Sequence, residues 1–107
     1  MIPRQFDIFL ARIRFRKCND IRPCIILYPP KSGTVTVAAI SSQERLFAYA
    51  QHFWLEPSHP NFPTTALTRR SYIAVNQIDT IEIGELIAFV GRLEGELARE
   101  FKDWYGL

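Results

Sequence analysis

Short strand-like segments follow one another along this chain, and almost every connection between them is too short for a parallel crossover. The runs at 24–28, 34–40 and 71–75 are apolar or β-branched, and proline, glycine or polar residues bound them. Parallel strands need a crossover of about a dozen residues or more. The segments must therefore pair antiparallel, which predicts a mainly β fold in the form of a small antiparallel barrel.

The length of the chain limits it to one core. It has 107 residues, of which 48% are hydrophobic, so we predict a single domain over 1–107. No apolar run approaches the roughly 18 residues that span a bilayer, and no signal-peptide hydrophobic region opens the chain. We expect a soluble cytoplasmic protein that does not enter a membrane.

Positive charge is concentrated in the first predicted strand, 6–16. Its odd positions from Phe9 to Phe15 are apolar, whereas its even positions change to arginine at Arg12, Arg14 and Arg16. We expect these arginines to form a row on one face. The row is either a solvated surface or, if it lies close to Arg22, part of a groove that follows the phosphates of a nucleic acid. The formal net charge of +2 does not distinguish the two.

Arg22 precedes Pro23 and the apolar run 24–27. Proline pushes the residue before it toward an extended backbone, so we expect Arg22 at the end of a loop over 17–21, at the rim of a strand. A guanidinium held there suits a bidentate contact with phosphate or carboxylate. The alternative is a surface ion pair with Asp20 or another acid.

A hairpin is predicted to bring Ser41 beside Arg22. The proline and glycine cluster at 29–33 turns the chain back, and the returning segment 34–40 ends at Ser41. The start of one antiparallel strand lies beside the end of its neighbour. We therefore expect a guanidinium and a hydroxyl together at one end of the sheet.

The rest of the chain is predicted to contain short strands and one long helix. We expect an insert at 44–50, a strand at 51–56, a loop at 57–63, and short strands at 71–75 and 80–81 that flank 76–79. Apolar residues recur at steps of three and four from Ile83 to Tyr105, which predicts an amphipathic helix. Its apolar stripe is Leu86, Val90, Leu93, Leu97, Phe101 and Trp104. We expect a second copy of the chain to cover part of it.

Five short motifs occur in a recognisable order. They are Asp7-Ile8-Phe9, Arg22-Pro23, Val37-Ala38-Ala39-Ile40-Ser41-Ser42, Ser71-Tyr72-Ile73, and Gln77-Ile78-Asp79-Thr80-Ile81 before the final helix. In this order and spacing the chain resembles the MazF/PemK-like toxins of bacterial toxin–antitoxin systems over nearly its whole length. The resemblance implies an SH3-like barrel with a C-terminal helix. It also implies a homodimer, a cognate antitoxin protein as partner, and cleavage of single-stranded RNA without metal or other cofactor.

The resemblance also implies roles for individual residues. The RNA 2′-hydroxyl attacks its own phosphodiester and leaves a cyclic phosphate and a 5′-hydroxyl, so no protein nucleophile is required. Arg22 matches the family's active arginine, and Ser41 stands where a serine or threonine closes the third strand. We assign Arg22 mainly to transition-state charge and leave the proton acceptor open. The expected RNA-binding residues are Arg12, Arg14, Arg16, Lys17, His59 and Gln77.

The chain departs from the family pattern at three positions. Phe6 replaces the glycine usually found before the first aspartate, and Ala74 and Asn76 stand where plasmid-type members carry a basic and an acidic residue. Cleavage, if retained, must then use Arg22 and Ser41. An inactive or altered toxin is the alternative.

Two alternative functions come from other features. Trp104-Tyr105-Gly106-Leu107 resembles the ending of the CcdB toxins, which trap DNA gyrase through their carboxyl terminus. The competing interpretation is that Trp104 packs in the helix and Gly106 caps it. A plain SH3-like binding module without toxicity is also compatible with the pattern.

The histidines and cysteines permit two kinds of chemistry. His52 and His59 are each candidate acids or bases for RNA cleavage, and the proline-rich loop would place His59 over a substrate groove. Together with Cys18 and Cys24 they include the residue types that bind zinc, but their spacings fit no common zinc site. We therefore predict no metal.

Overall fold

A computed structural model gives the arrangement of the chain. It describes residues 2–15, 18–42 and 52–107, with the backbone only at 13–15 and 18–20. The predicted insert at 44–50, together with Arg16 and Lys17, lies outside the described residues, and so does the side chain of Arg14.

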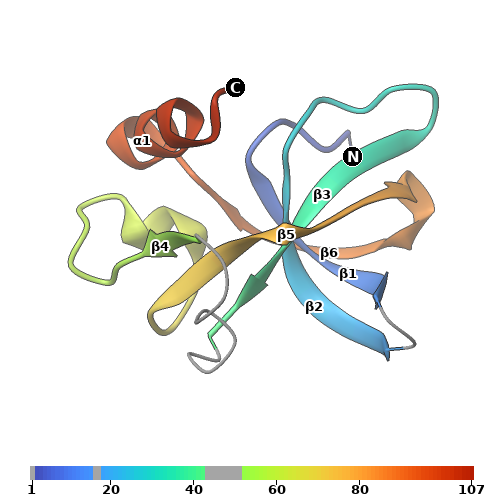
Figure 1. Cartoon of the computed structure of the whole chain (residues 1–107), viewed down its shortest axis with the longest axis horizontal. Helices are drawn as coiled ribbons and strands as arrows, with labels where there is room; N and C mark the ends of the chain where they lie inside the picture. Colours follow the sequence, from blue (N-terminus) through green and yellow to red (C-terminus); the bar gives the residue numbers. More distant parts are fainter. Residues whose placement is uncertain (1, 16–17, 43–51) are drawn as a thin grey trace.

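Six antiparallel strands form one strongly twisted sheet, from which a short helix extends (Figure 1). The strand order in the sheet is β4-β5-β3-β2-β1-β6. The mainly β fold with a C-terminal helix is therefore confirmed. The strands are β1 (Asp7–Phe15), β2 (Cys18–Ile26), β3 (Thr34–Ser41), β4 (Phe53–Leu55), β5 (Ser71–Glu82) and β6 (Leu86–Arg92); the helices are the 3₁₀ turns η2 (Phe62–Thr65) and η3 (Ile83–Glu85) and the α-helix α1 (Gly95–Tyr105).

The two faces of the sheet bury two different apolar clusters. Successive side chains in a strand point to opposite faces, so Ile8 and Ile25 join one cluster whereas Phe9 and Cys24 join the other. Helix α1 packs Leu97 and Phe101 into the first cluster, with both side chains buried. Among the described residues, no helix is long and apolar enough to cross a membrane.

The predicted helix from Ile83 to Tyr105 is wrong in its first half. Only Gly95–Tyr105 is α-helical, whereas Ile83–Glu85 is a 3₁₀ turn and Leu86–Arg92 is the edge strand β6. Spacings of three and four over so short a run do not distinguish a helix from a strand. Pairing with β1, in which Phe89 lies opposite Phe9, decides the outcome.

The stripe assigned to that helix is therefore divided between two elements. Leu86 and Val90 belong to β6, while Leu97 and Phe101 are buried against the chain's own core. No continuous helical stripe is left for a second copy to cover, and the dimer contact itself stays a prediction.

Two strands extend beyond their predicted limits. Strand β2 begins at Cys18, so Arg22 lies inside a strand and not at the end of a loop. Strand β5 runs without a break through 76–79, with a register shift opposite Ala38 and Ala39. Polar residues there suggested a turn, but pairing with β3 keeps them extended.

Candidate active site at the start of β2

The β2–β3 hairpin places Arg22 and Ser41 at the same end of the sheet. Cys24 lies opposite Ala39, and the two strands pair from there to Ile26 and Val37. Continuing this register by two residues sets Arg22 opposite Ser41, the arrangement that the hairpin predicts. Arg22 is half-buried and Ser41 is buried.

The row continues across the next two strands. Ser41 pairs with Tyr72 of β5, and Tyr72 pairs with Trp54 of β4. Directly opposed residues of an antiparallel pair share one face, so Ser41, Tyr72 and Trp54 form a line across three strands, and the extended β2–β3 register would add Arg22 to it. Tyr72 is buried, and its ring packs edge-on against Trp54 with 5.1 Å between centroids.

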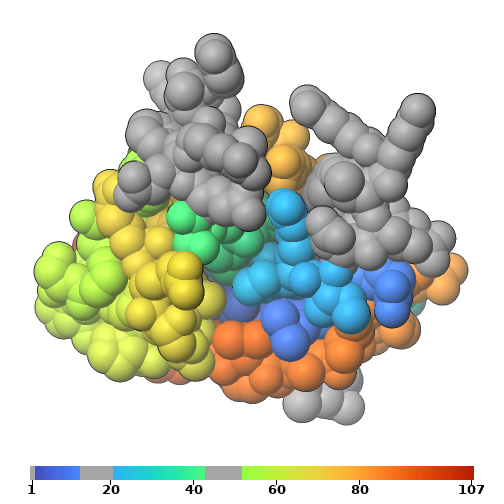
Figure 2. Space-filling view, turned by 90° about the horizontal axis from the view of Figure 1, so that it is seen from below, coloured from blue at the N-terminus to red at the C-terminus, as the bar shows by residue number. Residues whose placement is uncertain are grey.

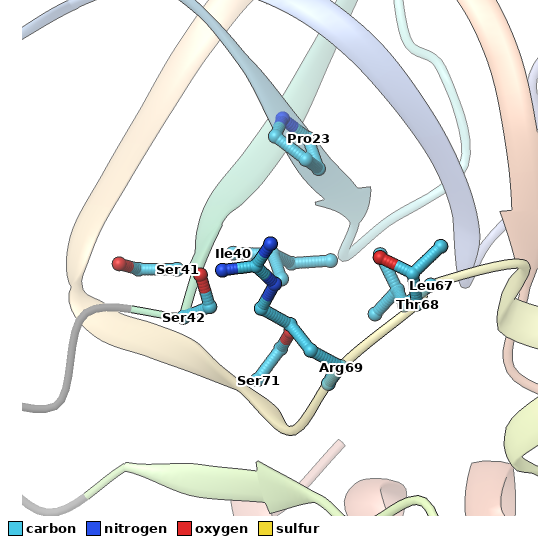
Figure 3. A pocket seen from close by; sticks show the side chains of 8 residues that line it. All are labelled: Pro23, Ile40, Ser41, Ser42, Leu67, Thr68, Arg69 and Ser71. Carbon is cyan, nitrogen blue, oxygen red and sulfur yellow. The ribbon is translucent and has the colours of Figure 1, made fainter.

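Pro23 separates β2 from β3 beside this row. It lies opposite Leu10 of β1, but pairing with β3 begins only at the following residue, Cys24. Proline has no N–H to donate to a neighbouring strand. A cavity of about 190 Å³ lies in the same region, lined by Pro23, Ile40 and Ser41 and by the turn before β5 (Figure 3).

This end of the sheet is exposed on one face of the molecule. In Figure 2 the end of β3, in green, lies between the turn before β5, in yellow, and β2, in light blue. Arginines come from both sides, with Arg22 on β2 and Arg69 and Arg70 before β5. The arrangement offers positive charge and hydroxyl groups on adjacent strands.

The family comparison agrees with this arrangement. A model of the family described as PemK-like, MazF-like toxin of type II toxin–antitoxin system matches residues 4–103. The chain belongs to this toxin family. The solved structure of the Mycobacterium tuberculosis toxin MazF-mt6 is similar in fold, with a TM-score of 0.64 and 21% identity, over 94% of this chain and 97% of that one. Comparison with curated proteins gave no match.

Arg12 is not brought to Arg22 in this MazF-like chain. It lies opposite Ile21, whereas Arg22 lies opposite Ala11. Because side chains alternate between faces, Arg12 and Arg22 are on opposite faces of the β1–β2 ladder. Arg12 instead lines a separate cavity with Asp79, Glu82 and Glu85. The alternative in which the row joins Arg22 in one groove therefore gains no support from Arg12, and its role in RNA binding stays a prediction. The side chains of Arg14, Arg16 and Lys17 are outside the described part of the chain.

His59 is held by helix α1 and by its own loop before η2. The Asn61 N–H donates to His59 Nδ1 at 3.0 Å, and His59 Nε2 lies 2.9 Å from Glu100 Oε2. Since Nδ1 accepts a hydrogen bond, Nε2 carries the proton and donates it to the carboxylate. Both ring nitrogens thus have partners within the protein, and the expected placement of His59 over a substrate groove is replaced by a contact that fixes the loop on α1.

Gln77 lies away from the row along β5. Its neighbour Ile78 pairs with Ala38, three residues before Ser41 on β3. At 3.3 Å per residue this separation is roughly 10 Å. The half-buried Gln77 side chain is therefore not brought next to Arg22 and Ser41, although its role in RNA binding stays a prediction.

The other histidine candidate, His52, is close to the row. Its ring stacks on Tyr72 with 4.5 Å between centroids and 17° between planes, and the residue is 9% exposed. Within the part of the chain that the structure describes, Nδ1 has no hydrogen-bond partner. The imidazole is thus buried behind the aromatic part of the row.

Sequence reasoning missed the turn that precedes β5. The Arg70 guanidinium lies 3.6 Å from the centroid of the Trp54 ring and forms an ion pair with Glu56. Arg69 lines the cavity beside Ser41. Two consecutive arginines just before a strand were the available signal, because the start of β5 and the end of β3 meet at one edge in an antiparallel pair.

The zinc and gyrase alternatives gain no support from the geometry. Cys24 is buried in the second apolar cluster, where desolvation raises its pKa to about 12, only partly opposed by a backbone hydrogen bond from Phe9. A thiol so protonated is a poor metal ligand. At the carboxyl end, Trp104 packs against Phe53, and Gly106 adopts the left-handed conformation that caps α1.

Proposed function

We propose that this family member is a metal-independent endoribonuclease that cleaves single-stranded RNA in the cytoplasm and so inhibits translation and growth. The observation that carries the proposal is the β2–β3 register, which ends at Cys24 and Ala39 and whose extension by two residues would set Arg22 opposite Ser41. The family membership supports it, since a toxin needs a target. Pro23 and the flanking strands hold this end of β2 in place, which favours a fixed charge.

The chemistry requires no nucleophile from the protein. The RNA 2′-oxygen forms a bond to phosphorus as the bond from phosphorus to the 5′-oxygen breaks. The products are a 2′,3′-cyclic phosphate and a 5′-hydroxyl, and the 2′-proton leaves to an acceptor. Negative charge grows on the phosphoryl oxygens in the five-coordinate transition state. Arg22 stabilises that charge, and the Ser41 hydroxyl donates a hydrogen bond to it.

Single-stranded RNA fits the site better than a duplex. Unstacked bases of a single strand can contact aromatic side chains and guanidinium planes. Trp54 and Arg70 already form such a pair at the far end of the row, with Arg70 over the ring. The RNA would then run from β2 across the ends of β3 and β5 toward β4.

RNA cleavage in the presence of EDTA tests the proposal. We expect purified protein to cut a long single-stranded RNA and to leave cyclic phosphate ends. Arg22→Ala should reduce the rate by roughly a hundredfold or more, because losing one preorganised charge donor raises the barrier by about 3 kcal/mol. Ser41→Ala should reduce the rate less.

A matched control separates charge at the site from charge in general. Arg99 is an exposed arginine on α1, paired with Glu96 at 2.6 Å. Arg99→Ala also removes one positive charge, but from α1 and not from β2, and should leave the cleavage rate unchanged. Full activity in a folded Arg22→Ala protein would show that the cleavage site lies elsewhere.

A further inference from the structure

The cavity between β3 and the turn before β5 has an apolar floor. Pro23, Ile40 and Leu67 come from three separate segments of the chain and all line it. Its volume is about 190 Å³, and Figure 3 shows the lining side chains, with Pro23 on β2 and Leu67 and Thr68 on the turn before β5. Such a floor suits a flat apolar group with polar edges better than a phosphate, which is hydrated on all sides.

The rim of the same cavity is polar and carries one cation. Ser42, Thr68 and Arg69 line it. In Figure 3 the Arg69 side chain extends from the turn before β5 toward the end of β3. Across residues 2–15, 18–42 and 52–107, the Arg69 guanidinium has no ion pair or hydrogen bond, and only the backbone carbonyl of Arg69 is engaged, by the Ser71 hydroxyl at 2.9 Å.

Arg69 differs in this respect from its neighbour. The Arg70 guanidinium lies over Trp54 and is neutralised by Glu56. The two neighbouring arginines therefore have different surroundings. Arg70 contacts Glu56 and the Trp54 ring, whereas Arg69 lines a cavity that has no acidic residue in its lining. A guanidinium presents several N–H donors in a fixed plane and no acceptor, so its partner there must present acceptor atoms side by side.

The cavity adjoins the proposed cleavage site. Ser41 lines it, and Pro23 directly follows Arg22. Arg22 and the cavity floor lie toward opposite faces of the sheet, because Arg22 shares a face with Ala11 whereas Pro23 shares one with Leu10. An RNA strand that passes the end of β3 would therefore meet Arg22 on one side and the cavity on the other.

We propose that this cavity binds one unstacked guanine base of the RNA, next to the cleaved bond, and that Arg69 recognises it. Guanine carries two acceptors, O6 and N7, side by side on one edge, and the two parallel hydrogen bonds that arginine makes to this pair are the commonest specific contact between arginine and a base. The apolar floor contacts the ring, and the Ser42 and Thr68 hydroxyls accept or donate at its remaining polar atoms. The inference rests on the proposed function, because it makes Arg69 a residue that sets the sequence preference of that reaction.

Binding of uncleavable oligonucleotides tests the inference without relying on cleavage. The probes are uracil hexanucleotides with 2′-fluoro sugars, which lack the attacking hydroxyl, and each carries a single guanine at a different position. We expect the unaltered protein to bind one of these at least tenfold more tightly than the all-uracil probe. Arg69→Ala should abolish the difference, and Arg69→Lys should lose most of it, because lysine has no planar fork.

Arg99→Ala serves again as the control and should keep the preference for guanine. Equal affinity of the unaltered protein for all probes would overturn the inference. So would an Arg69→Ala protein that binds every probe more weakly and shows a salt dependence lower by about one unit of slope, since that behaviour identifies a phosphate contact.

The two proposals fail in different ways. A preference for guanine in binding, without cleavage of ordinary RNA, would support the guanine-binding cavity and contradict the nuclease proposal. RNA cleavage that depends on Arg22 but shows no preference for guanine would support the nuclease proposal and contradict the proposal that the cavity binds guanine. Mapping the cut sites of the Arg69→Ala protein then shows whether the preference lost in binding is also lost next to the cleaved bond.

Discussion

Phe6 shows how one residue can keep a backbone that its own side chain disfavours. Its φ of 71° lies in the left-handed region, at the position where the family pattern has glycine. The Phe6 N–H donates to Ile26 O at 2.7 Å, and its carbonyl accepts from Leu93 N–H at 3.0 Å. The ring is buried and packs edge-on against Phe101. Tertiary contacts therefore hold Phe6 in a backbone conformation that is typical of glycine.

Cys24 is expected to be chemically inert in the folded protein. The raised pKa of about 12 means that almost none of the thiol is ionised near neutral pH, and the side chain is buried. In a Cys18→Ser background, which leaves Cys24 as the single thiol, iodoacetamide should alkylate the native protein very slowly and the denatured protein rapidly.

The rate of alkylation, followed by mass spectrometry, measures this directly. Because the folded pKa is raised, the thiolate fraction of the native protein stays far below that of the unfolded chain at both pH 7 and pH 9, so the native protein should be labelled more slowly at either pH. Rapid labelling of the native protein at pH 7 would show that the thiol is accessible and ionised.

From the sequence, Arg22 and Ser41 could be assigned to the same end of the sheet, whereas Arg69 could not, and the catalytic roles of Arg22 and Ser41 stay predictions. The first two are joined by one hairpin, whose register follows from a turn and two strands. Arg69 meets them through the turn before β5, which is distant in sequence and has no motif. Arg12 was misplaced because the alternation along β1 was correct but the register with β2 was unknown, and that register decides which face Arg22 shares.

Strand β6 and helix α1 show why element type was harder to predict at the carboxyl end. The same apolar spacing runs through both, so periodicity alone favoured one helix. One difference between the two elements is that the backbone of β6 lies very close to η2 at Gly91. A Cβ at Gly91 would lie 2.5 Å from Thr65 O and 2.6 Å from Thr64 O. A backbone this near to β6 needs glycine, and a lone glycine in an apolar run was the available signal of it.

Replacing Gly91 by alanine should destabilise the fold. The added methyl group must displace the backbone of η2, which carries Thr65, and overpacking of this kind costs about 1–3 kcal/mol. We expect a melting temperature several degrees lower. Thermal unfolding followed by circular dichroism measures the effect.

Gly84 offers a matched control for this substitution. It lies in the neighbouring turn η3, is exposed, and would place a Cβ with no atom within 4 Å. Gly84→Ala should leave the melting temperature nearly unchanged. Equal effects of the two substitutions would mean that β6 can move away from η2 without loss.

At the scale of the whole molecule, the described sheet has two edge strands, β4 and β6. Strand β6 ends the sheet, and among the described residues no strand pairs with its outer side. Ile87 and Phe89 are 51% and 46% exposed on it. Edge strands that are apolar and unpaired readily add a further strand, and this surface replaces the helical stripe as the place for a second copy.

We expect the chain to form a homodimer through the β6 edge. A two-fold axis beside β6 would pair the same surface of both copies and extend the sheet. The resulting groove would be longer than one barrel of this size provides, and an acidic antitoxin segment that orders on binding would compete with RNA for it.

Ile87→Lys places a charge on the edge and should give monomers in sedimentation at micromolar concentration. Ile21→Lys, at a residue of similar exposure on β2 (53%), should remain dimeric. Dimers in both variants would place the contact elsewhere, and an unaltered protein that is monomeric yet cleaves RNA would show that one chain builds the whole groove.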